Sequence, residues 1–269
     1  MKKFDLSTKK AFVCDLDGTL FMGSRPILPA IRFVTGHADD FAFYYLTNNT
    51  SKTPEAYLAK LRGAGIAVEA VAILTPLTTL ETYIREKGYR SVYLAANALV
   101  HGYLSARMPD VRFAYEPEAN QLVALTYDTE LTYEKLRCAA VLLNRNPALD
   151  FVASHGDACC PSEEGPLPDV GSMLALLKMT NGMTPTHVFG KPSPSLLAPV
   201  LARFAPSEVA LVGDRLYTDK AAADNAGVDF VCVLSGETTK ESLAAYRGLP
   251  PAAVVETLGD LGQDTENTG

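Results

Sequence analysis

The sequence predicts an α/β protein with a doubly wound parallel sheet. Short apolar runs recur along the 269 residues, and helix-like segments separate most of them. Several runs are continuously apolar instead of alternating with polar residues, which is typical of strands buried on both faces of a parallel sheet. The predicted strands are residues 11–14, 41–46, 91–95, 122–125, 151–153, 188–189, 209–212 and 230–233.

Apolar residues at helical spacing predict the helices between these strands. The predicted helices are residues 54–64, 133–143, 171–177 and 195–204. From residue 76 to residue 184 the pattern is less regular, because breaks that contain Pro or Gly interrupt it.

Composition excludes several classes of protein. A hydrophobic content of 48% with 20% charged residues is ordinary for a soluble globular protein, and a net charge of −7 argues against a nucleic-acid or acidic-membrane partner. No signal-peptide core or membrane-spanning stretch is evident, so we expect a cytoplasmic protein. The five cysteines form no C-x-x-C pattern, which favours reduced thiols over a zinc site.

The first polar cluster follows the strand predicted at 11–14 and reads Asp-Leu-Asp-Gly-Thr from Asp15 to Thr19. Side chains two residues apart in an extended chain point to the same side, so Asp15 and Asp17 converge if the strand geometry continues. Converging carboxylates repel unless a cation lies between them or one of them holds a proton. The pair predicts a metal site, a proton-transfer role, or both. An Asp-Gly turn would account only for Asp17 and Gly18.

Three more polar clusters follow predicted strands. They contain Thr47, Asn48 and Asn49 after 41–46, Lys191 in Gly-Lys-Pro after 188–189, and Asp214 and Asp219 after 209–212. Each cluster alone is also consistent with an ordinary loop or a helix cap. Ligands bind beyond the carboxyl ends of the strands in open α/β sheets, so we expect the clusters to serve one cleft.

The motif order Asp-x-Asp-Gly-Thr, Thr-Asn-Asn, Gly-Lys-Pro, Gly-Asp-x-x-x-x-Asp resembles the haloacid-dehalogenase-like phosphohydrolase superfamily. More narrowly, the chain is similar to the 4-nitrophenylphosphatase-like branch, subfamily IIA, whose members carry a large α/β cap between the second and third motifs. Thr47 and Lys191 are separated by about 100 residues more than one βα unit needs, which leaves room for a cap. The resemblance implies a Rossmannoid catalytic core at 1–77 and 185–269, with an inserted cap domain at 78–184.

The resemblance also implies roles for these residues. Mg²⁺ would be bound by the Asp15 carboxylate, the Asp17 backbone carbonyl and the Asp214 carboxylate. Asp15 would attack phosphorus and form an aspartyl-phosphate, and Asp17 would be first the general acid and then the general base. Lys191 would neutralise charge on Asp15 and on the transferred phosphoryl group.

The remaining motif residues would support this chemistry. The resemblance implies that the Thr47 hydroxyl and the Asn48 backbone amide bind phosphate oxygens, and it places Asn49 in the same phosphate-binding loop. Asp219 would orient Lys191 or a metal-bound water.

One loop of the expected cap departs from the pattern of the branch. The branch usually reads Thr-Asn-Pro-Asp where this chain has Ser-His-Gly-Asp, which keeps Asp157 but introduces His155. A second departure is Pro-Asp-Val-Gly at 168–171, where Pro-Gly-x-Gly is commoner. His155 is either a surface histidine or a contact to the leaving group, with Asp157 beside it, that alters substrate preference.

The sequence therefore predicts a Mg²⁺-dependent phosphatase of small phosphomonoesters. A phosphotransferase with the same aspartyl-phosphate is the alternative, and a catalytically silent phosphate-binding protein is a further one. The expected partner is a small-molecule phosphate ester, and the sequence leaves open whether a second copy of the chain joins it in a homo-oligomer.

Overall fold

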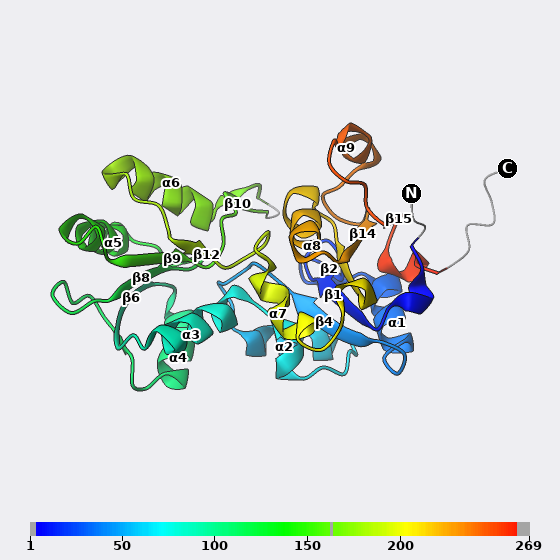
Figure 1. Cartoon of the computed structure of the whole chain (residues 1–269), viewed down its shortest axis with the longest axis horizontal. Helices are drawn as coiled ribbons and strands as arrows, with labels where there is room; N and C mark the ends of the chain where they lie inside the picture. The colour runs from blue at the N-terminus through cyan, green and yellow to red at the C-terminus, as the bar shows by residue number, and fades with distance from the viewer. Residues whose placement is uncertain (1–3, 162–163, 263–269) are drawn as a thin grey trace. The chain divides into compact units, whose positions relative to one another are not determined.

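The computed structural model describes residues 4–161 and 164–262, which form two compact units (Figure 1). The first unit contains residues up to Thr47, residues 57–74 and residues from Lys191 onward. The second unit contains residues 48–56 and 75–190. Each unit is described by itself below.

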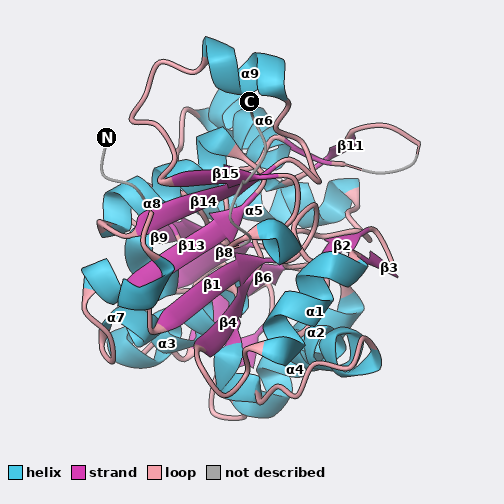
Figure 2. Ribbon diagram, turned by 90° about the vertical axis from the view of Figure 1, so that its right-hand side faces the viewer, coloured by secondary structure: helices cyan, strands magenta, loops and turns pink. Residues whose placement is uncertain are grey.

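The first unit is built on a six-stranded parallel sheet in the order β15-β14-β13-β1-β4-β5 (Figure 2). Its strands are β1 (Ala11–Asp15), β4 (Ala42–Leu46), β5 (Ile73–Leu74), β13 (Val209–Gly213), β14 (Asp229–Val233) and β15 (Ala253–Val255). A small antiparallel hairpin, β2 (Phe21–Met22) and β3 (Arg25–Pro26), follows β1. Its helices are α1 (Leu28–Gly36), α2 (Pro54–Gly63), whose first residues fall in the second unit, α7 (Ala198–Leu201), α8 (Ala221–Ala226) and α9 (Lys240–Ala245).

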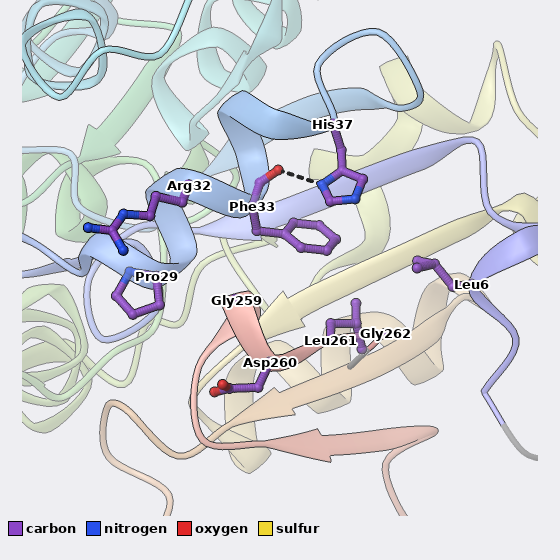
Figure 3. A pocket seen from close by; sticks show the side chains of 9 residues that line it. All are labelled: Leu6, Pro29, Arg32, Phe33, His37, Gly259, Asp260, Leu261 and Gly262. Carbon is purple, nitrogen blue, oxygen red and sulfur yellow. Dashed lines mark hydrogen bonds between the residues drawn. The ribbon is translucent and has the colours of Figure 1, made fainter. Parts of the chain in front are cut away.

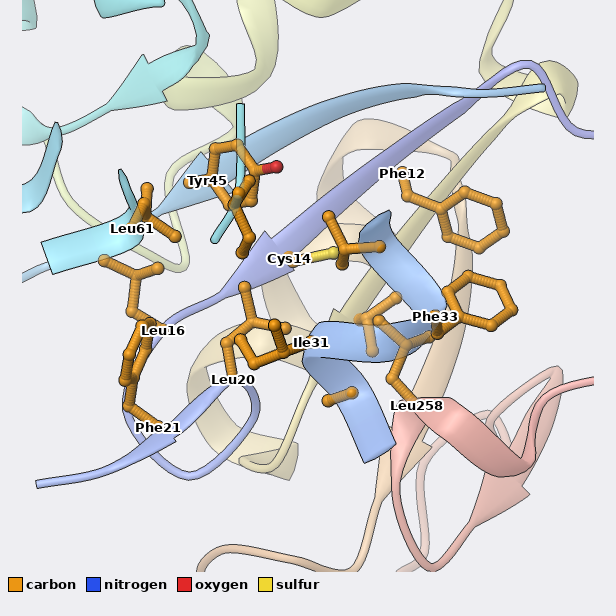
Figure 4. Packing of buried hydrophobic residues seen from close by; sticks show 14 of the residues in the cluster. Phe12, Cys14, Leu16, Leu20, Phe21, Ile31, Phe33, Tyr45, Leu61 and Leu258 are labelled. Atoms are coloured by element: carbon orange, nitrogen blue, oxygen red, sulfur yellow. The ribbon is translucent and has the colours of Figure 1, made fainter. Parts of the chain in front are cut away.

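Alternation along β1 builds a core on both faces of this sheet. Phe12 and Cys14 belong to one buried cluster, with residues of α1 and α2 (Figure 4). Ala11 and Val13 belong to another, with residues of α7 and α8. Successive side chains of a strand point to opposite faces, so a continuously apolar run is what a sheet covered on both sides requires. The prediction of a doubly wound parallel sheet is confirmed.

The second unit repeats this plan with a five-stranded parallel sheet in the order β12-β9-β8-β6-β7. Its strands are β6 (Ser91–Ala95), β7 (Arg112–Phe113), β8 (Leu122–Leu125), β9 (Asp150–Ala153) and β12 (His187–Val188), beside an antiparallel pair, β10 (Cys159–Cys160) and β11 (Leu167–Pro168). Its helices are α3 (Pro76–Lys87), α4 (Ala98–Arg107), α5 (Tyr133–Arg145) and α6 (Val170–Asn181). The Pro- and Gly-containing breaks seen in the sequence between 76 and 184 end helices and strands of this α/β unit and do not interrupt it.

Two boundaries differ from the sequence-based ones. The predicted helix at 195–204 is a 3₁₀ turn, Pro194–Leu197, followed by the short α7. Pro199 lacks the N–H group that one continuous helix would use at this position. The structure divides the chain after Leu74 and after Gly190, where the sequence predicted 77/78 and 184/185. The second boundary lies later because β12 pairs with β9 of the second unit.

Among the described residues, no helix has both the length and the apolar character needed to cross a membrane.

Candidate active site

Four predicted residues meet at the carboxyl ends of β1 and β13 in the first unit. The Lys191 ammonium donates to Asp15 Oδ1 at 2.5 Å and to Asp219 Oδ1 at 2.6 Å. Single carboxylate oxygens of Asp15, Asp214 and Asp219 all lie within 4.8 Å of one another. All four side chains are buried. Polar residues that follow separate strands therefore form one cluster, as their positions in the sequence predicted.

Burial and crowding shift the acidities of this cluster. Burial raises the pKa of Asp15 well above its ordinary range; Lys191 lowers it, while Asp219 and Asp214 raise it further. Burial, followed by the charge of Asp219, raises the pKa of Asp214 to about 6. Burial alone would lower the pKa of Lys191, but Asp15 and Asp219 outweigh it and raise that pKa, so the ammonium is charged.

Both oxygens of Asp219 are occupied within the protein. Oδ1 accepts from Lys191, and Oδ2 accepts from the backbone N–H of Arg215 at 3.0 Å. Asp214 differs, because Oδ2 accepts from the backbone N–H of Glu237 at 2.7 Å while its buried Oδ1 has no hydrogen-bond partner among the described residues. A buried acceptor without a partner is costly unless a ligand satisfies it.

These donors fit a divalent cation. Three carboxylates outnumber the single ammonium between them, and oxygen donors are what Mg²⁺ and Ca²⁺ prefer. Gly18, with φ +88°, keeps the approach to Asp214 open, because a Cβ there would lie 2.3 Å from Asp214 Oδ2. The Asp214 oxygen without a partner is the observation that points to the cation.

Asp17 has a different environment from Asp15. The β1 strand ends at Asp15, and Asp17 forms an isolated bridge with Phe21. The Asp17 side chain is 47% exposed, and its Oδ1 accepts from Lys60 of α2 at 3.2 Å. Its carboxylate does not belong to the buried group of three, so the two aspartates are chemically distinct.

The predicted phosphate-binding loop is divided between the units. Thr47 is a buried residue of the first unit, and its backbone N–H donates to Leu74. Asn48 and Asn49 belong to the second unit. The Asn48 side chain donates to Asp157 Oδ2 at 3.0 Å, and the Asn49 side chain accepts from the backbone and hydroxyl of Ser51.

His155 is completely buried in the second unit, so its interpretation as a surface histidine is wrong. Its Nε2 donates to Asp169 Oδ1 at 2.9 Å, and its Nδ1 accepts from the Ser154 hydroxyl at 3.0 Å. Ser154 in turn accepts from Thr50, whose oxygen accepts from the backbone N–H of Tyr127. We assign these proton positions because they give Thr50, Ser154 and His155 one donor and one acceptor role each, with all donors in this series of hydrogen bonds pointing the same way.

Close packing explains the glycine of the Gly-Lys-Pro motif. A Cβ on Gly190 would lie 2.4 Å from His155 Cβ and 2.7 Å from Asn48 Oδ1. His155, Asp157 and Asp169 also place ligand-type atoms within 4.8 Å of one another, which makes them a second cluster of metal-ligand type. His155 and Asp169, one departure from each of the two loops, are thus hydrogen-bonded to each other.

A groove of about 430 Å³ elsewhere in the first unit contains none of the predicted site residues (Figure 3). Arg32 and His37 of α1 line one side, and Asp260 of the 3₁₀ turn Leu258–Asp260 lies opposite. The His37 ring donates to the carbonyl of Phe33 at 3.0 Å and stacks on its side chain. We assign no chemistry to this groove.

Comparison with known proteins identifies the family. One family model, described as haloacid dehalogenase-like hydrolase, matches residues 12–106, and a second, HAD-hydrolase-like, matches residues 188–261. The acid sugar phosphatase of Staphylococcus saprophyticus is 30% identical over 96% of this chain and 98% of its own length. The chain belongs to the haloacid dehalogenase-like hydrolases. It is an enzyme, a phosphatase of this type.

Solved structures agree with this assignment. The 4-nitrophenylphosphatase of Thermotoga maritima has a TM-score of 0.87 and 31% identity, covering 96% of this chain and 98% of that one. A glycerol phosphate phosphatase of Mycobacterium tuberculosis in complex with calcium has a TM-score of 0.82 and 25% identity, covering 95% and 75%. The predicted superfamily and branch are confirmed, and use of a divalent metal is typical of this phosphatase family.

The sequence did not predict two features of the candidate active site in the first unit. The backbone N–H of Glu237 holds Asp214, and a backbone donor leaves no signature in residue type. Lys60 contacts Asp17, but its position on α2 looked like that of any solvated helix lysine.

Proposed function

We propose that this phosphatase hydrolyses small phosphomonoesters with Mg²⁺ and through an aspartyl-phosphate on Asp15. The observation that carries the proposal is the buried Asp15 carboxylate, which binds Lys191 and lies close to Asp214. Asp214 Oδ1 has no hydrogen-bond partner among the described residues and can bind a ligand. A carboxylate attacks a phosphate ester only where the negative charge of both is masked. The names of the relatives favour small substrates, since they describe phosphatases of sugar phosphates, of 4-nitrophenyl phosphate and of glycerol phosphate.

In the first step, a carboxylate oxygen of Asp15 bonds to phosphorus while the bond from phosphorus to the leaving oxygen breaks. Asp17 gives its proton to that leaving oxygen and becomes a carboxylate. Lys191 neutralises negative charge on Asp15 and on the transferred phosphoryl group. Its ammonium is already held by the carboxylates of Asp15 and Asp219, so it loses no bound water when negative charge moves from Asp15 to the phosphoryl group. The Thr47 hydroxyl and the backbone N–H groups of Asn48 and Asn49 bind phosphate oxygens in this proposal.

In the second step, the Asp17 carboxylate takes a proton from water, and the water oxygen bonds to phosphorus. The bond from phosphorus to Asp15 breaks, which releases phosphate and restores both carboxyl groups to their starting states. The half-exposed side chain of Asp17 supports this role, because a group that exchanges protons with substrate and water must be accessible. Asp219 keeps Lys191 in position through the bond to its ammonium.

A metal ion is proposed at the carboxylates of Asp15 and Asp214 and the backbone carbonyl of Asp17. When bound, Mg²⁺ supplies positive charge next to the phosphate oxygens and orients them for attack. The second unit is proposed as the cap, with residues 78–184 at its centre, and the loop with His155 and Asp157 as the part that affects substrate choice.

The test is phosphate release by wild type, Asp15→Asn and Asp40→Asn, with Mg²⁺ and with a chelator. Asp40 is exposed, so its substitution removes the same charge outside the site. We expect Asp15→Asn and the chelator each to lower turnover of 4-nitrophenyl phosphate by at least about a thousandfold, and Asp40→Asn to have wild-type activity. Substantial turnover by Asp15→Asn would contradict the aspartyl-phosphate. An added acceptor alcohol distinguishes a phosphotransferase, which would form a new ester in place of free phosphate.

A further inference from the structure

Lys60 lies on α2 of the first unit and makes two contacts with its ammonium group. Nζ donates to Asp17 Oδ1 at 3.2 Å and lies 4.3 Å from the centroid of the Phe21 ring. Phe21 is itself buried, and it is bridged to Asp17 through the backbone. The cation therefore lies on a fixed ring beside the carboxylate that it contacts.

Stability gives little reason for this arrangement. The Lys60 side chain is 22% exposed and that of Asp17 is 47% exposed, and ion pairs so open to solvent stabilise a fold weakly. A cation over an aromatic face, in contrast, gains energy from the geometry itself. The Phe21 ring restricts where the ammonium can lie, and the ammonium restricts how the carboxylate can turn.

We propose that Lys60 is a positioning residue that orients the carboxyl group of Asp17 for proton transfer. This inference rests on the function proposed above. Lys60 donates to Oδ1, so Oδ2 is the oxygen that gives its proton to the leaving oxygen and later takes one from water. If the Asp17 carboxyl group rotates away from this orientation, proton transfer to the leaving oxygen is slower, because part of the rate gain of a general acid comes from its fixed position.

The leaving group separates this role from a merely structural one. 4-Nitrophenolate is a weak base and departs without a proton, whereas phenolate and alkoxide ions are stronger bases and depend on the acid. The quantity to compare is kcat/KM, because it reports the steps up to cleavage of the ester bond. Loss of fold or of substrate binding would lower kcat/KM for all phosphate esters alike.

The experiment measures kcat/KM of the full chain for 4-nitrophenyl phosphate, phenyl phosphate and glycerol phosphate. We expect Lys60→Met to lose about tenfold on phenyl phosphate and at most about twofold on 4-nitrophenyl phosphate. Lys60→Arg keeps the charge and the ring contact and should recover most of this loss. Asp17→Asn is the benchmark, with a selective loss of about a hundredfold or more.

Lys240→Met is the matched control, because it removes the same charge from an exposed pair with Glu256. It should behave as wild type on every ester. Lys60→Gln takes the place of Lys60→Met if the methionine variant does not fold.

Two outcomes overturn the inference in distinguishable ways. If Asp17→Asn discriminates between the esters while the neutral Lys60 variant loses equally on all of them or loses nothing, Lys60 has no positioning role. If Asp17→Asn itself loses equally on all three esters, the general-acid assignment in the proposed function is wrong, and the role of Lys60 is overturned with it.

Discussion

Each unit brings three metal-ligand side chains within 4.8 Å of one another, all buried in the first unit and with Asp157 half-buried in the second, but the two clusters differ in whether their polar atoms have partners. In the first unit, Asp214 Oδ1 is buried with no partner among the described residues. In the second unit, both ring nitrogens of His155 are hydrogen-bonded, and Asp169 accepts from His155 and from the backbone N–H of Val170. Proximity of ligand-type side chains is common to both clusters, so it does not by itself identify a metal site.

Charge separates the clusters as well. Asp15 and Asp219 share the ammonium of Lys191, and Asp214 beside them is affected by the charges of Arg215 and Lys191 without a bond to that ammonium. Burial and mutual repulsion still raise the pKa of Asp15 and of Asp214. In the second cluster the neutral groups of Ser154 and Asn48 supply the remaining hydrogen bonds. The first cluster is incomplete without a cation, and the second is complete as a hydrogen-bonded network.

The largest expected difference is in metal binding. Asp214→Asn removes the carboxylate that has the unpartnered oxygen, and we expect Mg²⁺ affinity to fall by at least about a hundredfold, with a similar loss of turnover at limiting Mg²⁺. Asp169→Asn, the matched change in the second cluster, should leave Mg²⁺ affinity within about threefold of wild type. Calorimetric titration of each metal-free variant measures both. Metal binding that survives Asp214→Asn and is lost in Asp169→Asn would reverse the assignment of the two clusters.

A smaller effect is expected in stability, and it tests whether the second cluster is a structural unit. Asp169→Gly leaves the buried Nε2–H of His155 without an acceptor, and His155→Asn leaves Asp169 without its ring partner. Each should lower the free energy of unfolding by about 2 kcal/mol. The double variant has the residues usual in the branch at these two positions and removes both orphaned groups, so its loss should be smaller than the sum of the single losses by about 1–2 kcal/mol.

Urea unfolding of the four proteins measures this coupling. Glu134 and Arg137 form an exposed pair in the same unit, and a parallel cycle on them should show weaker coupling. Strict additivity of His155→Asn and Asp169→Gly would show that the two departures from the branch pattern are independent.

The same contrast shows what the sequence could predict. Asp15 follows β1, and Asp214 and Asp219 follow β13, so the pairing of these strands in one parallel sheet brings the three carboxylates together. Lys191 follows β12 of the other sheet, so its contacts with Asp15 and Asp219 do not follow from this pairing. A strand that ends in a polar motif can be recognised from neighbouring residues alone. Once two such strands pair in a parallel sheet, their polar motifs lie at the same edge. The roles of these residues remain proposals that the experiments above test.

The second cluster depends on contacts that no local pattern contains. Ser-His-Gly-Asp reads as a loop, and burial of His155 depends on Asp169, fourteen residues later, and on close packing against Gly190. Lys60 was missed for a related reason, since only the fold places Phe21 and Asp17 next to it. The environments of His155 and Lys60 depend on residues that are distant in the sequence, so residue type and local pattern do not predict them.

The smallest expected effect is the pH dependence of metal binding, and it should occur in the first cluster alone. Burial and Asp219 raise the pKa of Asp214 from 3.8 to about 6, so between these two pH values the folded, metal-free protein holds a proton that an unfolded chain would release. This proton stabilises the metal-free fold at low pH, and the benefit is lost as the pH rises through 6. A cation must displace the same proton, so through Asp214 the Mg²⁺ affinity should fall by about fivefold between pH 6 and pH 5 and change little above about pH 7. Titration calorimetry at these pH values measures the slope. Asp169→Asn should keep that slope, and equal affinities at pH 5 and pH 7 in wild type would show that Asp214 does not bind the cation as a carboxylate that competes with protons.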